Sequence, residues 1–140
     1  MKKSAKISEI FSKYTGLRHC SISDNSGEEF YHKKLNQLFY ETFKEGNKLE
    51  IILDGNRGYS PSFIDESFGN LVYDFTLEKV INNLEIVSND IPMWKDSIVT
   101  KTYPLWESRR LNKDTPKKTI HHDDWWAFID NKFAKINMSK

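Results

Sequence analysis

Two short apolar runs, each ending at an aspartate, constrain the fold more than any other feature of this sequence. The run KLEIILDG spans residues 48–55 and reaches Asp54, and the run LEIVSND spans residues 84–90 and reaches Asp90. Both are too short for a buried helix, and segments with helical spacing flank them, which favours buried strands. Strands that alternate with helices predict an α/β fold with at least one right-handed β-α-β crossover. We therefore expect a small mixed β-sheet flanked by helices.

The first predicted helix starts in the sequence SGEEF. Ser26 can cap the amide of Glu29 while Glu29 reaches back to Ser26, which is the pattern of a capping box, and Gly46 stands at the other end as a stop signal. Apolar residues between these two ends recur at close to helical spacing. They predict one buried helix face.

Two more helices are predicted after the apolar runs. One begins at Ser60 or Ser62, with a proline in its first turn, and reaches about residue 75. The other covers residues 91–111 with Asp90 as its cap. Because a proline in a helix interior removes a backbone hydrogen bond, we expect Pro104 to kink or break this helix.

The two ends of the chain are predicted to form different structures. Residues 6–22 alternate apolar and polar side chains around a turn at Thr15-Gly16, which predicts a short β-hairpin. Residues 121–137, HHDDWWAFIDNKFAKIN, begin with acids and continue with aromatic residues at near-helical spacing, so they predict an extra C-terminal helix. The expected organisation is a domain over residues 1–112, with a linker and an aromatic helix over residues 113–140.

The adjacent tryptophans Trp125 and Trp126 indicate a contact beyond that helix. Consecutive residues on a helix diverge by about 100°, so both rings cannot face the same core. One of them is expected to meet a neighbouring element, a second subunit or a partner protein, where aromatic side chains often anchor interfaces. Packing on the chain's own domain and contact in a homodimer or with a partner both remain open.

Composition excludes several classes of protein. A chain of 140 residues has room for one domain of ordinary size, and its single cysteine, Cys20, excludes an internal disulfide framework and a cysteine-cluster zinc site. Residues 101–140 hold nine Lys/Arg against five Asp/Glu, an excess too small and too interrupted for a nucleic-acid footprint. No stretch is apolar enough for a membrane span. We expect a soluble cytoplasmic protein with no nucleic-acid or membrane partner.

The motif GYSPSFIDESFGNL at residues 58–71 carries a resemblance to a known family. Together with IILDG before it and LEIVSND after it, the motif resembles the STAS-like domain family of unknown function, which is related in fold to anti-sigma-factor antagonists. The elements SGEEF and FSKYTGLR also match, so the resemblance covers roughly residues 7–111. It implies a STAS-like α/β fold and a bacterial-type role in signalling and regulation.

The resemblance also implies a mechanism of regulation. In anti-sigma-factor antagonists, a GHKL-type kinase phosphorylates a serine at the start of the helix that follows the aspartate-bearing strand, and this blocks partner binding. Ser62 falls nearest to that serine, and Ser60 is the neighbouring candidate. The resemblance therefore implies a non-enzymatic adaptor that binds a protein partner through the loop and helix surface of residues 58–70, with a GHKL-type kinase or ATPase as the expected partner class.

The residues themselves allow a second function at the same place. A helix N-terminus favours an anion, glycines give the loop backbone freedom, and Arg57 offers a bidentate cation for a phosphate. The alternative is therefore a nucleotide- or anion-binding domain, and ordinary helix capping by the serines is the simplest reading. The expected partner- or anion-binding residues are Asp54, Arg57, Gly58, Ser60, Ser62, Phe63 and Glu66.

Other groups give weaker signals for chemistry. The run from His121 to Asp124 contains metal-ligand residue types, but four consecutive residues on a helix cannot converge on one ion, so helix capping is favoured. His19 and Cys20 face opposite sides of a predicted strand. An enzyme built on Asp54 with the acids of residues 65–66 has no positive support, because the sequence holds no catalytic or nucleotide-binding motif. We expect no enzyme activity, no cofactor and no metal ligands.

Overall fold

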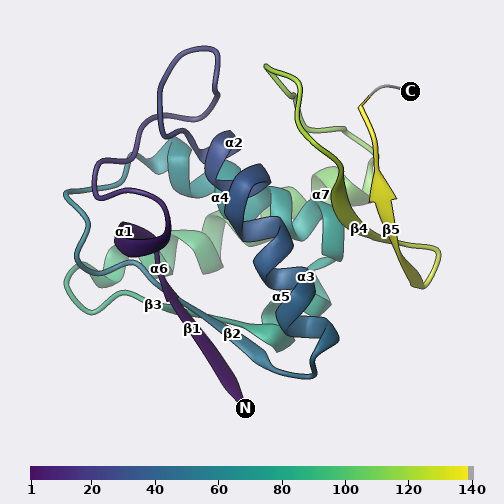
Figure 1. Cartoon of the computed structure of the whole chain (residues 1–140), viewed down its shortest axis with the longest axis horizontal. Coiled ribbons are helices and arrows are strands. Elements are labelled where there is room, and N and C mark those ends of the chain that lie inside the picture. Colours follow the sequence, from purple (N-terminus) through teal and green to yellow (C-terminus); the bar gives the residue numbers. More distant parts are fainter. Residues whose placement is uncertain (139–140) are drawn as a thin grey trace.

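A computed structural model describes residues 1–138 of the chain, and its centre is a three-stranded sheet. The strands are β1 (Lys2–Lys6), β2 (Lys48–Ile52) and β3 (Leu84–Val87), all parallel and in the order β1-β2-β3. In Figure 1 the sheet lies along the lower side of the molecule, with the helices above it. The predicted α/β class and the two strands at the apolar runs are confirmed.

The two faces of the sheet differ in polarity. Its inner face is buried under the helices and carries the apolar side chains Leu49, Ile51, Leu84 and Ile86. Its outer face carries charged side chains that pair across the strands, since Lys2 contacts both Glu50 and Glu85. Alternating burial of this kind fixes the register, because a slip by one residue would turn charges into the core.

The first long helix begins and ends as predicted. It runs through α2 (Gly27–Phe30), a π-helical turn η1 (Tyr31–Leu35) and α3 (Asn36–Lys44), and it stops before Gly46, which has a positive φ of 78°. The side chain of Ser26 accepts a hydrogen bond from the Glu29 amide, as a cap should. Glu29 reaches back to the amide of Asn25 rather than to that of Ser26.

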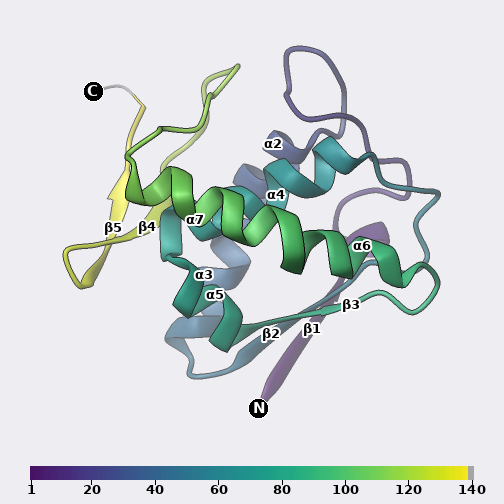
Figure 2. The same cartoon turned by 180° about the vertical axis from the view of Figure 1, so that it is seen from behind.

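The later helices pack side by side. The helix α4 (Pro61–Phe75) begins at the predicted cap Ser60, and a short helix α5 (Leu77–Asn83) leads into β3. The last long helix consists of α6 (Pro92–Ser97), the π-helical turn η2 (Ile98–Thr102) and α7 (Tyr103–Leu111). Figure 2 shows it lying alongside α4, where the ring of Trp106 covers Gly69 and leaves no room for a Cβ atom.

Two predictions about the last long helix need correction. Its N-cap is Ile91, without a side-chain hydrogen bond, so Asp90 is not the cap. Pro104 does not break the helix. The distortion predicted there takes the form of the π-helical turn η2 just before it, whose wider geometry accommodates the proline ring.

The predicted N-terminal hairpin is wrong. Residues Ile7–Ile10 form the single helical turn α1, and residues 11–26 form a loop without regular structure. The apolar side chains of Ile7, Ile10 and Phe11 pack on the core from one side of that turn, so their spacing is helical rather than alternating. The strand of this region, β1, lies before it and pairs with β2.

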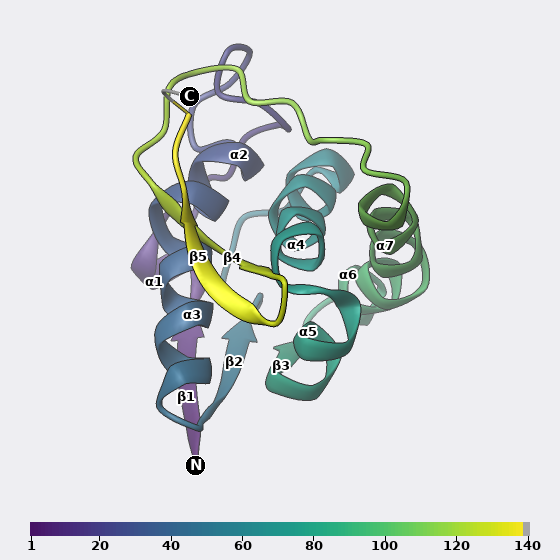
Figure 3. The same cartoon turned by 90° about the vertical axis from the view of Figure 1, so that its right-hand side faces the viewer.

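The predicted extra C-terminal helix is also wrong, because residues 125–136 form a β-hairpin. Its strands are β4 (Trp125–Ile129) and β5 (Lys132–Ile136), which pair antiparallel. Asp130 and Asn131 both have positive φ, 53° and 64°, which two-residue hairpin turns of the favoured hand require. Figure 3 shows the hairpin lying across α3 and α4, apart from the three-stranded sheet.

Candidate functional site

The start of α4 places the two candidate serines in different roles. The Ser60 hydroxyl accepts a hydrogen bond from the Phe63 amide at 3.0 Å and donates one to the carbonyl of Gly16. The Ser62 hydroxyl lies 3.2 Å from that of Ser60 and lines a surface groove. Ser60 is therefore the structural cap, and Ser62 is the serine that faces the groove.

Two acids near the start of α4 are paired with a cation from a distant loop. Arg18, in the loop of residues 11–26, contacts Asp65 at 2.8 Å and Glu66 at 3.0 Å. His19 also lies 3.7 Å from Glu66. Despite burial, which opposes the charged form, the two carboxylates raise the pKa of Arg18. This cation fixes the loop against the first turns of α4 and reduces the negative charge beside Ser62.

The groove has a volume of about 640 Å³ and lies between the start of α4 and the last long helix. Its lining is mainly apolar, with charged groups at its edge, and includes two strongly exposed side chains, Met93 at 70% and Leu105 at 54%. Tyr59 and Trp94 contact each other edge to face on its wall. We call this feature the α4 groove. Its lining residues are Arg18, Tyr59, Pro61, Ser62, Ile64, Asp65, Met93, Trp94, Ser97, Lys101, Thr102 and Leu105.

The remaining predicted site residues differ in exposure, and only some of them lie at the surface. Arg57 and Gly58 are exposed in the loop before α4. Asp54 accepts hydrogen bonds from the amides of Asn89 and Asp90, so it holds the loops after β2 and β3 together. Phe63 and Glu66 are buried, at 0% and 2% exposure, which removes them from any surface that a partner touches. Sequence reasoning missed most of the groove, because its second wall comes from the last long helix.

Both tryptophans of the hairpin pack on the domain. The Trp126 ring stacks on Tyr40 with 3.8 Å between centroids, and its backbone amide and carbonyl both bond to the side chain of Asn36. Trp125 is 7% exposed and meets His32 edge to face. Neighbouring residues in a strand point to opposite faces, so each ring meets a different part of the domain. Trp125 is buried and Trp126 is half-buried, so at most part of the Trp126 ring is accessible to a second subunit or a partner.

A half-buried carboxylate lies beside strand β4 of the hairpin. Asp74 accepts a hydrogen bond from Tyr31 and lines a cavity of about 480 Å³ together with Lys118 and Trp125. Burial raises the pKa of Asp74 to about 6, although Tyr31 and the ammonium of Lys118 oppose that rise. Burial also lowers the pKa of Lys118. The charged forms of both groups are thus disfavoured in the folded chain.

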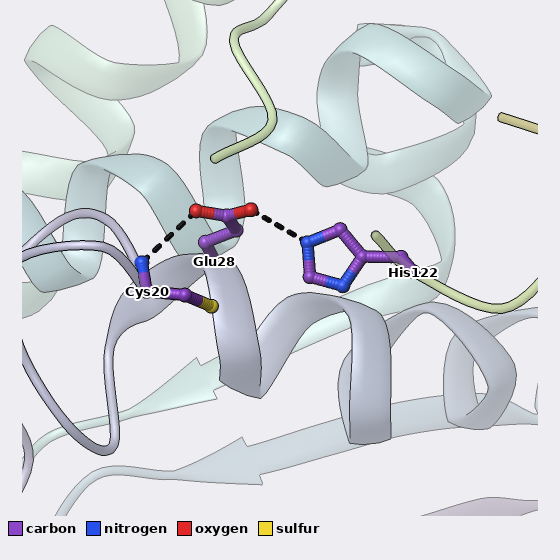
Figure 4. A group of neighbouring side chains, drawn as sticks. All are labelled: Cys20, Glu28 and His122. Carbon is purple, nitrogen blue, oxygen red and sulfur yellow. Dashed lines mark hydrogen bonds and ion pairs between the residues drawn. The ribbon is translucent and has the colours of Figure 1, made fainter. Parts of the chain in front are cut away.

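A second cluster brings together Cys20, Glu28 and His122, and Figure 4 shows the first and last approaching the carboxylate from opposite sides. Glu28 is fully buried, and one of its oxygens lies 2.6 Å from Nε2 of His122. Its carboxylate accepts hydrogen bonds from the amides of Cys20 and Thr119 and from the Thr119 hydroxyl. Burial opposes ionisation, but these bonds hold the pKa of Glu28 down at about 2.

His122 is held in the cluster by a ring stack. His32 lies parallel to it, with centroids 3.9 Å apart and planes at 14°. Within residues 1–138, neither ring nitrogen of His32 has a hydrogen-bond partner. Burial, helped by the neighbouring His122 and Lys118, lowers the pKa of His32 to about 2, so this ring is neutral. The predicted helix cap at residues 121–124 does not exist, because this segment is an extended loop that buries His122.

Comparison with known proteins identifies the central part of the chain. Residues 26–93 match the family model described as STAS-like domain of unknown function (DUF4325). We refer to residues 26–93, which are similar to this family, as the STAS-like domain. No curated protein and no solved structure matched the chain. Among residues 1–138, no helix combines the length and the apolar character that crossing a membrane requires.

The STAS-like domain supplies only part of each site. It contributes Ser62 and Met93 to the α4 groove and Glu28 to the buried cluster. Cys20 precedes the matched region and His122 follows it, so this cluster joins the STAS-like domain to both flanking segments. The cluster residues lie 8 and 94 positions apart in the sequence, and no local pattern signals them.

Proposed function

We propose that the chain is a non-enzymatic regulatory or adaptor module that binds a protein partner in the α4 groove. The observation that carries this proposal is the apolar, solvent-exposed lining of that groove next to Ser62. Exposed apolar side chains gathered in a groove are typical of surfaces that bind other proteins. Met93, in the first turn of the last long helix, and Leu105, near the start of α7, are 70% and 54% exposed.

The proposed occupant is a short apolar segment of the partner, such as one face of an amphipathic helix. Helices of this kind bind in apolar grooves through side chains spaced along one face. Lys101 is exposed at the groove edge and suits an acidic residue beside that segment, since Arg18 is already paired with Asp65 and Glu66. A GHKL-type kinase or ATPase is the partner class that the resemblance to anti-sigma-factor antagonists suggests.

Phosphorylation of Ser62 is the proposed switch. A phosphate adds nearly two negative charges at pH 7. At Ser62 these charges would stand in the wall of an apolar groove, beside the carboxylate of Asp65. A bound apolar segment would have to strip water from the phosphate, and the phosphate would repel an acidic residue on that segment. Both effects would weaken binding. Ser60 is the weaker candidate because its hydroxyl is engaged as the cap of α4.

The absence of enzyme activity is part of the proposal. The acids near the groove are occupied with structural partners: Asp65 and Glu66 with Arg18, and Asp54 with two backbone amides. A catalytic carboxylate more often has an oxygen within hydrogen-bond reach of a ligand.

The alternative, a nucleotide or other anion at the start of α4, has weaker support. Ser60 already satisfies the Phe63 amide, and Asp65 lies in the next turn, where its charge opposes an anion. Ligand that binds the folded state raises the melting temperature, so a clear rise with a nucleotide would favour this alternative over the adaptor.

Site-specific crosslinking in the native host tests the adaptor proposal. A photoreactive amino acid in place of Met93 should trap one protein reproducibly. The same amino acid in place of Ile22, which is 64% exposed but outside the groove, should not. Ser62→Glu should abolish the crosslink from position 93, and Ser62→Ala should retain it.

Two outcomes would contradict the proposal. Equal crosslinking from positions 93 and 22 would remove the groove as the binding surface. Unchanged crosslinking in Ser62→Glu would remove the switch but leave the groove. Peptide mapping of protein from the host, with and without phosphatase, shows independently whether Ser62 carries a phosphate.

A further inference from the structure

The side chains of Cys20, Glu28 and His122 have the composition of a metal site. One ligand atom from each, a sulfur, a carboxylate oxygen and an imidazole nitrogen, lies within 4.8 Å of the other two. These are the atoms with which proteins bind Zn²⁺, and a mixed set of sulfur, nitrogen and oxygen ligands suits that borderline-soft ion. From this arrangement we propose that the chain binds a zinc ion through Cys20, Glu28 and His122.

The nitrogen and oxygen ligand atoms need little adjustment to receive the ion, and the sulfur of Cys20, which lies within 4.8 Å of both, would move closer by up to roughly 1 Å. At typical bond lengths, neighbouring ligand atoms of a tetrahedral zinc lie roughly 3.3–3.7 Å apart. Nε2 of His122 and the nearer oxygen of Glu28 are 2.6 Å apart because they share a hydrogen bond. Zinc would replace the shared proton and widen that gap by roughly 0.7 Å, which side-chain rotation provides.

The surroundings already hold the ligands in place. One oxygen of Glu28 accepts hydrogen bonds from the amide of Cys20 and the hydroxyl of Thr119. The other oxygen accepts a hydrogen bond from the amide of Thr119. The Ser26 hydroxyl lies 3.4 Å from the sulfur of Cys20. Metal ligands are usually oriented by such outer hydrogen bonds, which raise affinity by restricting the side chains.

His32 orients the site but is not a ligand. The lone pair of an imidazole nitrogen lies in the plane of its ring, so an ion bound to His122 lies in the plane of that ring. The His32 plane is stacked parallel to it, with 3.9 Å between centroids, and therefore misses the ion. His32 is a positioning residue, and a water completes the tetrahedron, as in zinc sites with three protein ligands.

The charges of the cluster favour a divalent cation. Glu28 is fully buried, and within residues 1–138 its ion-pair partner is His122. A zinc ion binds the cysteine as a thiolate, so Cys20 and Glu28 together supply two negative charges that the ion balances. Cys20 is half-buried, which leaves a route for the ion to enter.

Zinc at this position would tie three segments into one unit. Cys20 comes from the loop of residues 11–26, Glu28 from the first turn of α2, and His122 from the segment between α7 and β4. The last segment has no regular secondary structure. Binding to the folded chain alone would therefore stabilise the attachment of both flanking segments to the STAS-like domain.

Cobalt titration of the full-length, chelator-treated protein tests this proposal. One equivalent of Co²⁺ should produce a thiolate-to-cobalt band in the near ultraviolet and the intense visible bands of tetrahedral cobalt, and Zn²⁺ should displace both. Cys20→Ser should remove the near-ultraviolet band. His122→Gln should weaken Zn²⁺ binding by about 100-fold or more, at least the loss that removal of an outer hydrogen bond causes.

His121→Gln is the matched control, because this neighbouring histidine is exposed and outside the cluster. It should retain the affinity and the spectrum of the unaltered protein. The proposal is overturned if the unaltered protein shows no thiolate-to-cobalt band, a result that does not depend on any variant folding. It is also overturned if His121→Gln abolishes binding while His122→Gln does not.

Discussion

Replacing Asn36 with alanine is expected to release the C-terminal hairpin while the rest of the domain stays folded. Asn36 is 2% exposed, and its amide side chain bonds to both backbone groups of Trp126, each at 2.8 Å. Its nitrogen also donates to the hydroxyl of Tyr31 at 2.9 Å. One side chain of α3 thus pairs with β4 as a neighbouring strand would.

The size of the effect follows from the two hydrogen bonds to Trp126, because the bond to Tyr31 lies within the domain and is lost whether the hairpin is open or closed. Each contributes about 0.5–1.5 kcal/mol net, and the partly buried groups of Trp126 that lose a partner add to the cost. We expect a total of about 3 kcal/mol, because leaving a buried polar group without its partner costs about 1–3 kcal/mol and two such groups of Trp126 are affected. Because about 1.4 kcal/mol corresponds to a factor of ten, the open form of the hairpin should become about 100-fold more populated.

Hydrogen exchange measured by mass spectrometry checks this prediction. Amides of residues 125–136 should exchange about 100-fold faster in Asn36→Ala, whereas those of α4 should keep their rates. Asn112→Ala, at an exposed position near the end of α7, is the control. Equal acceleration in α4 and the hairpin would show that the two unfold as one unit. An unchanged hairpin would show that Asn36 does not hold it.

Four further substitutions test the packing, a half-buried charge, and the two serines at the start of α4. Gly69→Ala should lower the free energy of unfolding by about 1–3 kcal/mol in urea, because its new methyl group meets the Trp106 ring. Asp74→Asn should raise the melting temperature at pH 7 and change it little at pH 4. The pKa of this group rises from 3.8 to about 6 on folding, so the cost of its charge is absent below pH 4 and complete above pH 6. This cost of the Asp74 charge amounts to at most about 3 kcal/mol of stability. The actual cost is smaller, because Asp74 is partly exposed and solvent screens its charge. Ser60→Ala should cost about 1 kcal/mol of stability, and Ser62→Ala less than about 0.5 kcal/mol.

The parts of the fold that the sequence predicts are those with strong local signals. The strand β2 and the helix α4 follow each other at Asp54 and Ser60, where an apolar run, a turn and a cap are contiguous. The start of α2 at Ser26 has the same kind of signal. In each case the residues that decide the structure lie within one or two turns of each other, so propensity and tertiary structure agree.

The C-terminal hairpin was mispredicted because its sequence satisfies two periods. Its aromatic residues fit a helical stripe, but Trp125 and Ala127 also alternate with Trp126 and Phe128 as in a strand. The turn residues Asp130 and Asn131 resolve the ambiguity, because they tolerate positive φ better than most residues. The buried cluster has no such local signal, since Glu28 and His122 meet only after α2 and the segment before β4 have packed together.

The loop of residues 11–26 connects the two candidate sites, and this connection can be measured. Its Gly16 and Arg18 contact Ser60 and Asp65 at the start of α4, while Cys20, two residues further on, belongs to the proposed zinc site. If zinc binds there, it should restrain the loop and slow hydrogen exchange in residues 58–65. Cys20→Ser should remove that response. Zinc binding that leaves exchange in residues 58–65 unchanged would show that the two ends of the loop move independently.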